Sequence, residues 1–167
     1  MKKLLVLYIL PIFILTGCQH AQSGWVTHKV DERITIKFPS SPKQLKPGSF
    51  LALGKNGSYV FTLVNFMQVA GIDSTALAPV KATSAFAAQM KTGLKKTLPD
   101  VTLDDFKIGK WNGFTSYTTS GFDSKKKRYD LFMFIIGDNL YSLSAVTANG
   151  ASLKEKDTFF SSVTLTP

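Results

Sequence analysis

The sequence predicts an α/β (α+β) fold in which a twisted antiparallel sheet of about six to eight strands is sandwiched by two helices. Asn-Gly dipeptides at 56–57 and 112–113 each separate two strand-like segments, as they do in β-hairpins. Segments 58–67 and 128–136 carry apolar side chains on both faces, so each is expected to be a central strand. Two amphipathic helical segments can cover the two faces of the sheet.

The first part of the domain is predicted to contain four strands. Segments 25–30 and 34–38 are the first two, and the second alternates apolar and polar residues. A polar loop over 39–48 then leads to a hairpin of strands 49–55 and 58–67, in which both residues of the Asn-Gly turn should have positive φ.

The clearest helix is expected near 79–97. Pro79 suits the first position of a helix, and Leu98-Pro99 ends it. Residues spaced four apart form one apolar stripe: Ala82, Phe86, Met90 and Leu94. This stripe is predicted to pack on the sheet.

Four further strands and a second helix complete the predicted domain. The strands are 106–111, 114–122, 128–136 and 140–148, arranged as a meander of hairpins. The second helix, near 152–161, brings a pair of phenylalanines to the core.

Three short stretches, together with this order of elements, resemble the PsbP-like proteins. They are IKFPSSP at 36–42, NLYSL at 139–143 and FFSSV at 159–163. That family takes its name from an extrinsic subunit of the photosynthetic oxygen-evolving complex and includes small bacterial lipoproteins. The resemblance implies one PsbP-like α/β/α domain over 24–167 and a non-enzymatic helper of a larger membrane assembly. It transfers no partner-contacting or metal-associated residue to this chain.

The N-terminal segment indicates export. A basic start precedes an apolar run over 4–15, which is shorter than the roughly 20 residues needed to span a bilayer. Leu15-Thr16-Gly17-Cys18 resembles the lipobox of bacterial lipoproteins. The resemblance implies that 1–17 is a signal peptide cleaved between Gly17 and Cys18, and that Cys18 is acylated with palmitate-type chains. Residues 18–23 would then form a lipidated tether.

This segment also predicts where the protein works. A lipid anchor of two or three acyl chains holds a small protein on a membrane for long times. Gln19 follows the cysteine, whereas lipoproteins of this kind are retained at the inner membrane by Asp at that position. We therefore expect a lipid-anchored protein of the cell envelope, in the periplasm and on the outer membrane where the organism has two membranes.

The charge balance favours a membrane surface over nucleic acid as a partner. The formal net charge is +9, and without residues 1–17 it is +7, from 18 basic and 11 acidic side chains. A tethered envelope protein would not meet nucleic acid, whereas anionic lipid attracts lysines near a membrane; a solubilising cationic surface is the alternative. The densest cluster forms a candidate surface contact in a hairpin turn: Lys125, Lys126, Lys127 and Arg128.

No catalytic or metal-binding pattern stands out. His20 falls in the tether and His28 is expected on the outer face of the first strand, so neither a His/Cys metal site nor a Ser-His-Asp triad is supported. Asp100, Asp104 and Asp105 match no calcium loop and are expected in a solvated loop beside Lys95 and Lys96. We predict no cofactor.

One strand is unusually rich in hydroxyl groups. Its residues are Thr115, Ser116, Thr118, Thr119 and Ser120. Such a strand is typical of a wet sheet face, and an exposed edge that recruits a partner strand is the alternative.

We expect a non-catalytic binding or accessory subunit of an envelope protein assembly. A membrane-anchored hydrolase or transferase using Ser, Asp and Lys is one alternative, and it requires a pocket with a buried Lys or Asp beside a Ser. A binder of a small apolar ligand is another, and it would show a cavity lined by Phe between sheet and helix.

Overall fold

The computed structural model describes residues 24–166. The strands are β1 (Val26–Lys29), β2 (Ile34–Phe38), β3 (Lys43–Lys46), β4 (Ser49–Leu53), β5 (Gly57–Asn65), β6 (Val101–Leu103), β7 (Lys107–Trp111), β8 (Phe114–Asp123), β9 (Arg128–Ile136), β10 (Asn139–Thr147) and β11 (Thr164–Leu165). The helices are α1 (Phe66–Ala70), α2 (Ser74–Leu77), α3 (Ser84–Thr97) and α4 (Lys154–Ser161). The domain is therefore mixed α+β, as predicted.

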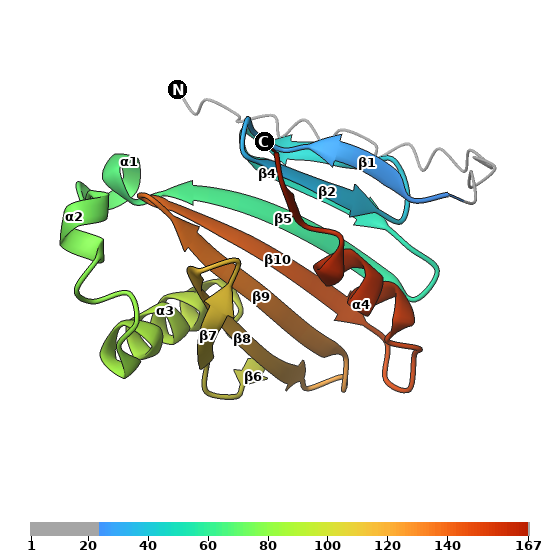
Figure 1. Ribbon diagram of the computed structural model, residues 1–167. Helices are drawn as coiled ribbons and strands as arrows, with labels where there is room; N and C mark the ends of the chain where they lie inside the picture. The colour runs from blue at the N-terminus through green and yellow to red at the C-terminus, as the bar shows by residue number, and fades with distance from the viewer. Residues whose placement is uncertain (1–23, 167) are drawn as a thin grey trace, which may run out of the picture.

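The strands form two antiparallel sheets (Figure 1). The large sheet has eight strands in the order β3-β4-β5-β10-β9-β8-β6, with β7 also paired to β8. The predicted central strands, β5 and β9, each have a partner on both sides. β1 and β2, which were expected in this sheet, instead form a smaller sheet with β11. The expected strand number is still met, because the short strands β3 and β6 belong to the large sheet.

One face of the large sheet is covered by α4 and the small sheet. Alternate residues of β2 are fully buried there, together with Phe159 of α4. They pack on the aromatic residues that β5, β9 and β10 present to the same side: Tyr59, Phe61, Phe134 and Tyr141. This cluster is the main hydrophobic core.

The opposite face is covered by α3, but only in part. Phe86, Met90 and Leu94 pack against Tyr117, Met133 and Ile135, so the predicted apolar stripe is confirmed from Phe86 onwards. The buried positions beneath the helix belong to β8 and β9. The equivalent face of β5 and β10 is only half-buried.

The start of the long helix differs from the prediction. Pro79 and Ala82 lie before the helix, which begins at Ser84. The Thr83 hydroxyl accepts a hydrogen bond from the backbone N–H of Phe86 at 3.2 Å, which is an N-cap. The cap satisfies one of the backbone donors that the first turn of a helix starting at Ser84 leaves without a partner inside the helix.

The two Asn-Gly turns differ from each other. Asn112 and Gly113 both have positive φ, as predicted for a tight hairpin. Asn56 and Gly57 do not, because Gly57 already belongs to β5. A Cβ at Gly57 would lie 2.2 Å from the carbonyl oxygen of Val146, so this glycine is required by a close backbone approach.

Three buried tyrosines make the fold sensitive to alkaline pH. Burial raises the pKa of Tyr117 to about 12 and also raises the pKa values of Tyr59 and Tyr141. The Tyr59 hydroxyl donates to Glu155 at 3.0 Å, and the Tyr141 hydroxyl donates to Asp31 at 2.7 Å. Both carboxylates raise the pKa of their tyrosine further.

We expect the free energy of unfolding to fall as the pH rises above about 10. In that range the unfolded chain releases phenolic protons that the folded chain retains, so stability is complete below pH 10 and decreases above it. The expected loss is about 1 kcal/mol per pH unit or more between pH 10 and 12. Urea unfolding at several pH values measures it, and Tyr117→Phe should show a shallower decline. A stability that does not change up to pH 11.5 or so would contradict the burial of these phenols.

Candidate functional site

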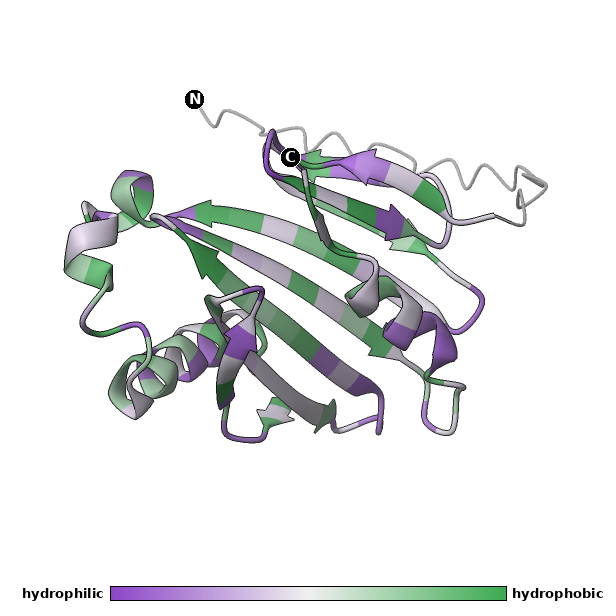
Figure 2. Cartoon of the chain, viewed as in Figure 1, coloured by the Kyte–Doolittle hydropathy of each residue, from purple (hydrophilic) through white to green (hydrophobic). Residues whose placement is uncertain are grey.

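One end of the large sheet carries a concentration of lysines, which we call the basic end. The strand register places Gly57, Thr147 and Arg128 in one row across β5, β10 and β9. The turns next to these three residues therefore lie at the same end of the large sheet. The C-terminus of α3 lies there too, because Val101, four residues after the helix, pairs with Asp123 at the end of β8. The basic end consists of seven exposed lysines: Lys55, Lys95, Lys96, Lys125, Lys126, Lys127 and Lys154. Figure 2 shows the β4–β5 turn, the β8–β9 turn and the start of α4 as hydrophilic segments.

The nearby carboxylates are largely engaged. Asp123 accepts hydrogen bonds from the backbone N–H groups of Lys125 and Lys127 at 2.9 and 2.8 Å. Glu155 accepts from the backbone N–H groups of Lys55 and Asn56 and from the Tyr59 hydroxyl. Asp100 remains exposed at the end of α3. The basic end therefore presents an excess of positive charge.

The described chain begins at this same end. Trp25 lines a shallow hollow with Lys55, Asn56 and Lys154. Its side chain also packs against the main core. The segment that precedes the domain is thus joined to it beside the lysines.

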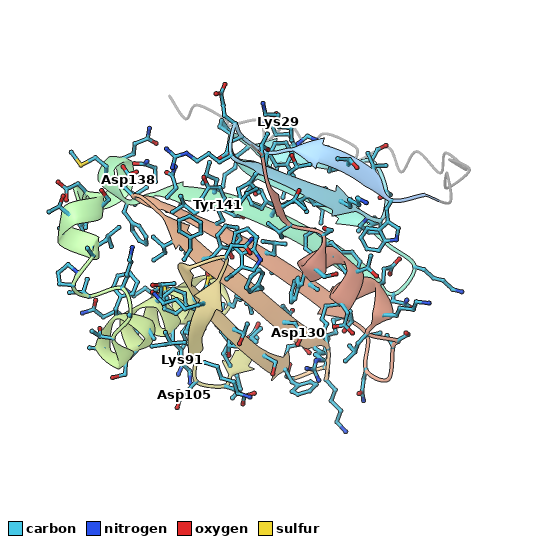
Figure 3. The ribbon with its side chains drawn as sticks, viewed as in Figure 1. Lys29, Lys91, Asp105, Asp130, Asp138 and Tyr141 are labelled. Atoms are coloured by element: carbon cyan, nitrogen blue, oxygen red, sulfur yellow. The ribbon has the colours of Figure 1, made fainter. Side chains whose placement is uncertain are left out.

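The opposite end has a different character. It carries Asp31 and Glu32 in the β1–β2 turn, Asp73 before α2 and Asp138 in the β9–β10 turn. Figure 3 shows Asp138 at one end of the sheet and Asp130 near the other. Acidic and basic side chains are mixed at this end, because Arg33 lies in the same turn as Asp31 and Glu32, and Lys46 lies at the β3–β4 turn.

Of the four predicted contact residues, Arg128 differs from the three lysines. Its guanidinium makes a bidentate pair with Asp130, with Nε–Oδ2 and Nη2–Oδ1 distances of 2.8 and 2.9 Å. It also lies 5.9 Å from the centre of the Phe122 ring. Asp130 is 5% exposed, and its hydrogen bond raises the pKa of Arg128. Arg128 is held within the fold, whereas Lys125, Lys126 and Lys127 are exposed.

We expect Arg128→Gln to lower the free energy of unfolding by about 2 kcal/mol, because it leaves the Asp130 carboxylate without its partner. Lys126→Gln, the matched surface change, should alter it by less than about 0.5 kcal/mol. Urea unfolding of both variants measures the difference. Equal values would show that the Arg128–Asp130 pair contributes nothing.

The second feature of the site is an apolar groove between α3 and the half-covered sheet face. Its volume is about 570 Å³. The floor is formed by residues of β5, β9 and β10: Val60, Thr62, Val64, Tyr129, Leu131, Met133, Leu140, Ser142, Ser144 and Val146. The wall is formed by α3 and the residue that follows it: Met90, Leu94, Thr97 and Leu98. The lining of the groove contains no Phe, whereas the apolar-ligand alternative was expected to show a cavity lined by Phe.

The groove exists because side chains on this face are short. In β5 the residues facing α4 and the small sheet include Tyr59 and Phe61, whereas Val60 and Thr62 face the groove. β10 repeats the pattern, with Tyr141 on the core side and serines on the other. Sequence reasoning missed this site, and the alternation of large and small residues in these two strands is the signal that could have revealed it.

A smaller polar hollow tests the hydrolase alternative. It contains the buried Asp130 beside Ser120, its cross-strand neighbour. The Ser120 hydroxyl donates to Asp104 at 3.2 Å, and Asp130 is paired with Arg128. Asp130 is thus held by Arg128, while Asp104 accepts the hydrogen bond of the Ser120 hydroxyl, so the hollow contains the buried Asp beside a Ser that the hydrolase alternative requires.

Other predicted positions are placed as follows. His28 was expected to face outwards, but it points inwards, where its ring centre lies 4.4 Å from that of Phe50. Asp105 pairs with Lys91 at 2.7 Å, not with Lys95 or Lys96. Within residues 24–166, no group of three or more His, Cys, Asp or Glu side chains is arranged to hold a metal ion.

The hydroxyl-rich strand is an interior strand. β8 pairs with β9 on one side and with β6 and β7 on the other, so the exposed-edge interpretation is wrong. Thr115, Ser116 and Thr119 are buried, so most of this strand is not a wet face either. Gly17, Cys18 and His20 lie outside the described residues.

No helix in residues 24–166 is both long enough and apolar enough to cross a bilayer.

Comparison with known proteins yields a fold relationship. No family model matches the chain, and no curated protein matches it. The solution structure of the cyanobacterial PsbP (CyanoP) from Synechocystis sp. PCC 6803 is similar, with a TM-score of 0.60 and 14% sequence identity. The alignment covers 91% of this chain and 99% of that chain. The predicted PsbP-like fold is therefore confirmed.

A second solved structure is more distant. It is a crystal structure from Bacteroides thetaiotaomicron VPI-5482, with 13% identity and a TM-score of 0.43. The alignment covers 80% of this chain but only 45% of that chain. This fit is too loose to establish a common fold.

Proposed function

We propose that this chain is a lipid-anchored lipoprotein of the cell envelope, and that its PsbP-like domain is a non-catalytic binding or accessory subunit of an envelope protein assembly. The observation that carries the proposal is the lipobox-like Leu15-Thr16-Gly17-Cys18, which precedes the folded domain by a few polar residues. Acylation of Cys18 would place the domain on a membrane surface, and Gln19 favours the outer membrane.

The basic end supports this arrangement. Cys18 is six residues from Gly24, so the tether reaches at most about 20 Å. The tether joins the domain beside Trp25, Lys55 and Lys154. Lysines near an anionic membrane contribute about 1 kcal/mol each. The domain is thus proposed to stand with its basic end on the headgroups and the opposite end, with the β1–β2 and β9–β10 turns, away from them.

The two tryptophans, Trp25 and Trp111, allow this orientation to be tested. Trp111 pairs with Phe114 and packs on Phe134, towards the end opposite Trp25. In vesicles that contain phosphatidylglycerol and brominated lipid, Trp111→Phe leaves Trp25 as the fluorophore, and Trp25→Phe leaves Trp111. We expect stronger quenching of Trp25. Equal quenching of the two tryptophans would contradict the orientation.

The accessory role has a separate basis. The PsbP-like family is named after an extrinsic subunit of a larger complex, and this chain has a PsbP-like fold. On a tethered domain, weak contacts suffice because tethering raises the effective concentration. A photo-crosslinking residue at Glu32, in the β1–β2 turn at the end opposite the basic end, should capture one defined envelope protein in intact cells, and the same residue at Lys126 should not. No capture from either position would contradict a protein partner at the end that carries Glu32.

The apolar groove favours a second candidate function, the binding of a small apolar ligand. Its volume of about 570 Å³ lies within the range of ligand sites, and its lining is mainly aliphatic.

A further inference from the structure

We propose that the groove binds one acyl chain of an anionic single-chain amphiphile, with the chain along β5 and β10 and the charged head at the basic end. This inference rests on the second candidate function and names its ligand class.

The shape of the groove fits an extended chain. Its floor on β10 runs from Leu140 to Val146, seven residues of strand that span about 20 Å. The opposite wall is Met90, Leu94 and Leu98. A long space with a mainly aliphatic lining is suited to a hydrocarbon chain.

The short side chains of the floor are the central observation. Thr62, Ser142 and Ser144 lie in the middle of a mainly aliphatic surface, where longer side chains would fill the space. Core positions are normally packed to high density. The same strands are fully packed on their other face, where Tyr59, Phe61 and Tyr141 have no exposed surface. A guest chain would supply the missing volume.

Charge at one end of the groove selects the head group. Tyr129 and Val146 pair with each other and line one end of the groove. The next pair along the strands, Arg128 and Thr147, belongs to the basic end. The β8–β9 turn with Lys125, Lys126 and Lys127 is separated from Tyr129 by one residue, and Lys96 precedes Thr97, another lining residue. An anionic carboxylate or phosphate at this end would be attracted by these four lysines, which outnumber the two carboxylates near the Tyr129 hydroxyl, Asp123 and Asp100.

The test uses the full-length protein as its host produces it, held in nanodiscs of phosphatidylcholine, and a photoreactive diazirine analogue of palmitate. After illumination and digestion, we expect the label on peptides that contain Val60, Leu94 or Leu140. Palmitate and lysophosphatidylglycerol should both compete with labelling, the first as a free fatty acid and the second as a lipid with an anionic head. Zwitterionic lysophosphatidylcholine should compete about tenfold less well.

Variants test the site directly. Ser144→Leu and Thr62→Leu each fill the floor and should reduce labelling about tenfold. Ser74→Leu, the same change on the exposed surface of α2, should not reduce it. Charge reversal by Lys96→Glu with Lys126→Glu should weaken competition by palmitate several-fold, and Lys46→Glu, at the exposed edge strand β3, should not. Unchanged melting temperatures show that the variants are folded.

Several results would overturn the proposal. They are labelling outside the groove, full labelling of Ser144→Leu and Thr62→Leu, equal competition by the zwitterionic lipid, and crosslinking of two copies of the chain through the groove. The label enters the groove whether or not Cys18 is acylated, so Cys18→Ala should label like the parent. Failure of the groove is therefore separate from failure of the lipid anchor.

Discussion

Replacement of Cys18 by Ala is expected to abolish incorporation of radiolabelled palmitate into the protein. The diacylglyceryl group of a lipoprotein is attached to the thiol of this residue, and Cys18 is the one cysteine in the chain. Without acyl chains, attachment would depend on the uncleaved apolar run over 4–15 and on the basic end, whose contribution of about 1 kcal/mol per lysine is screened by salt. Less of the variant than of the parent should therefore remain on membranes in high salt.

The control for this prediction is Gln19→Ala, which changes the neighbouring residue and leaves the thiol. It should incorporate palmitate like the parent and resist extraction by salt. Because signal processing follows acylation in this class of lipoprotein, Cys18→Ala should also keep residues 1–17 and migrate as a larger protein. Labelling of Cys18→Ala at the parental level would show that the lipobox interpretation is wrong.

The elements that the sequence predicted well carry strong local signals. β5 and β9 have apolar residues on both faces, and both are central strands of the large sheet. The stripe of Phe86, Met90 and Leu94 packs on the sheet at the expected spacing. These signals are local because side-chain periodicity directly reflects which faces are buried.

The elements that were missed are short or depend on distant partners. β3 is four exposed residues, Lys43–Lys46, without an alternating apolar pattern. β6 has three residues, and α2 has four. The separation of β1 and β2 into a second sheet depends on pairing with β11, more than a hundred residues away. Periodicity within a short window cannot identify such a partner.

The site was harder to predict than the fold, for a physical reason. The lysines of the basic end come from four separate segments, and only the register of the large sheet places them together. The cluster at 125–128 was visible in the sequence, but its division into three exposed lysines and one paired arginine depends on Asp130. The groove arises because short side chains of β5 and β10 lie side by side on one sheet face, and this becomes evident only when the two strands are known to be neighbours.

The largest stability effect within the domain is expected for Phe159→Ala. Phe159 has no exposed surface and joins three elements: its ring centre lies 5.3 Å from that of Phe38 in β2 and 5.4 Å from that of Tyr59 in β5. Truncation removes these contacts and leaves a cavity, so we expect the free energy of unfolding to fall by about 3–5 kcal/mol. Urea unfolding followed by circular dichroism measures the change.

The Phe159→Ala substitution should also destabilise one part of the domain more than the rest. α4 and the small sheet cover the same face of the large sheet through Phe159, so amide exchange in β1 and β2 should accelerate more than exchange in β8 and β9. Phe122→Ala is the matched control, because Phe122 is 46% exposed and its loss should cost less than about 1 kcal/mol. If both variants lost the same stability, Phe159 would not be the contact that holds α4 on the sheet. A large loss for Phe159→Ala alone would show that burial of this ring keeps the small sheet and the helix in place.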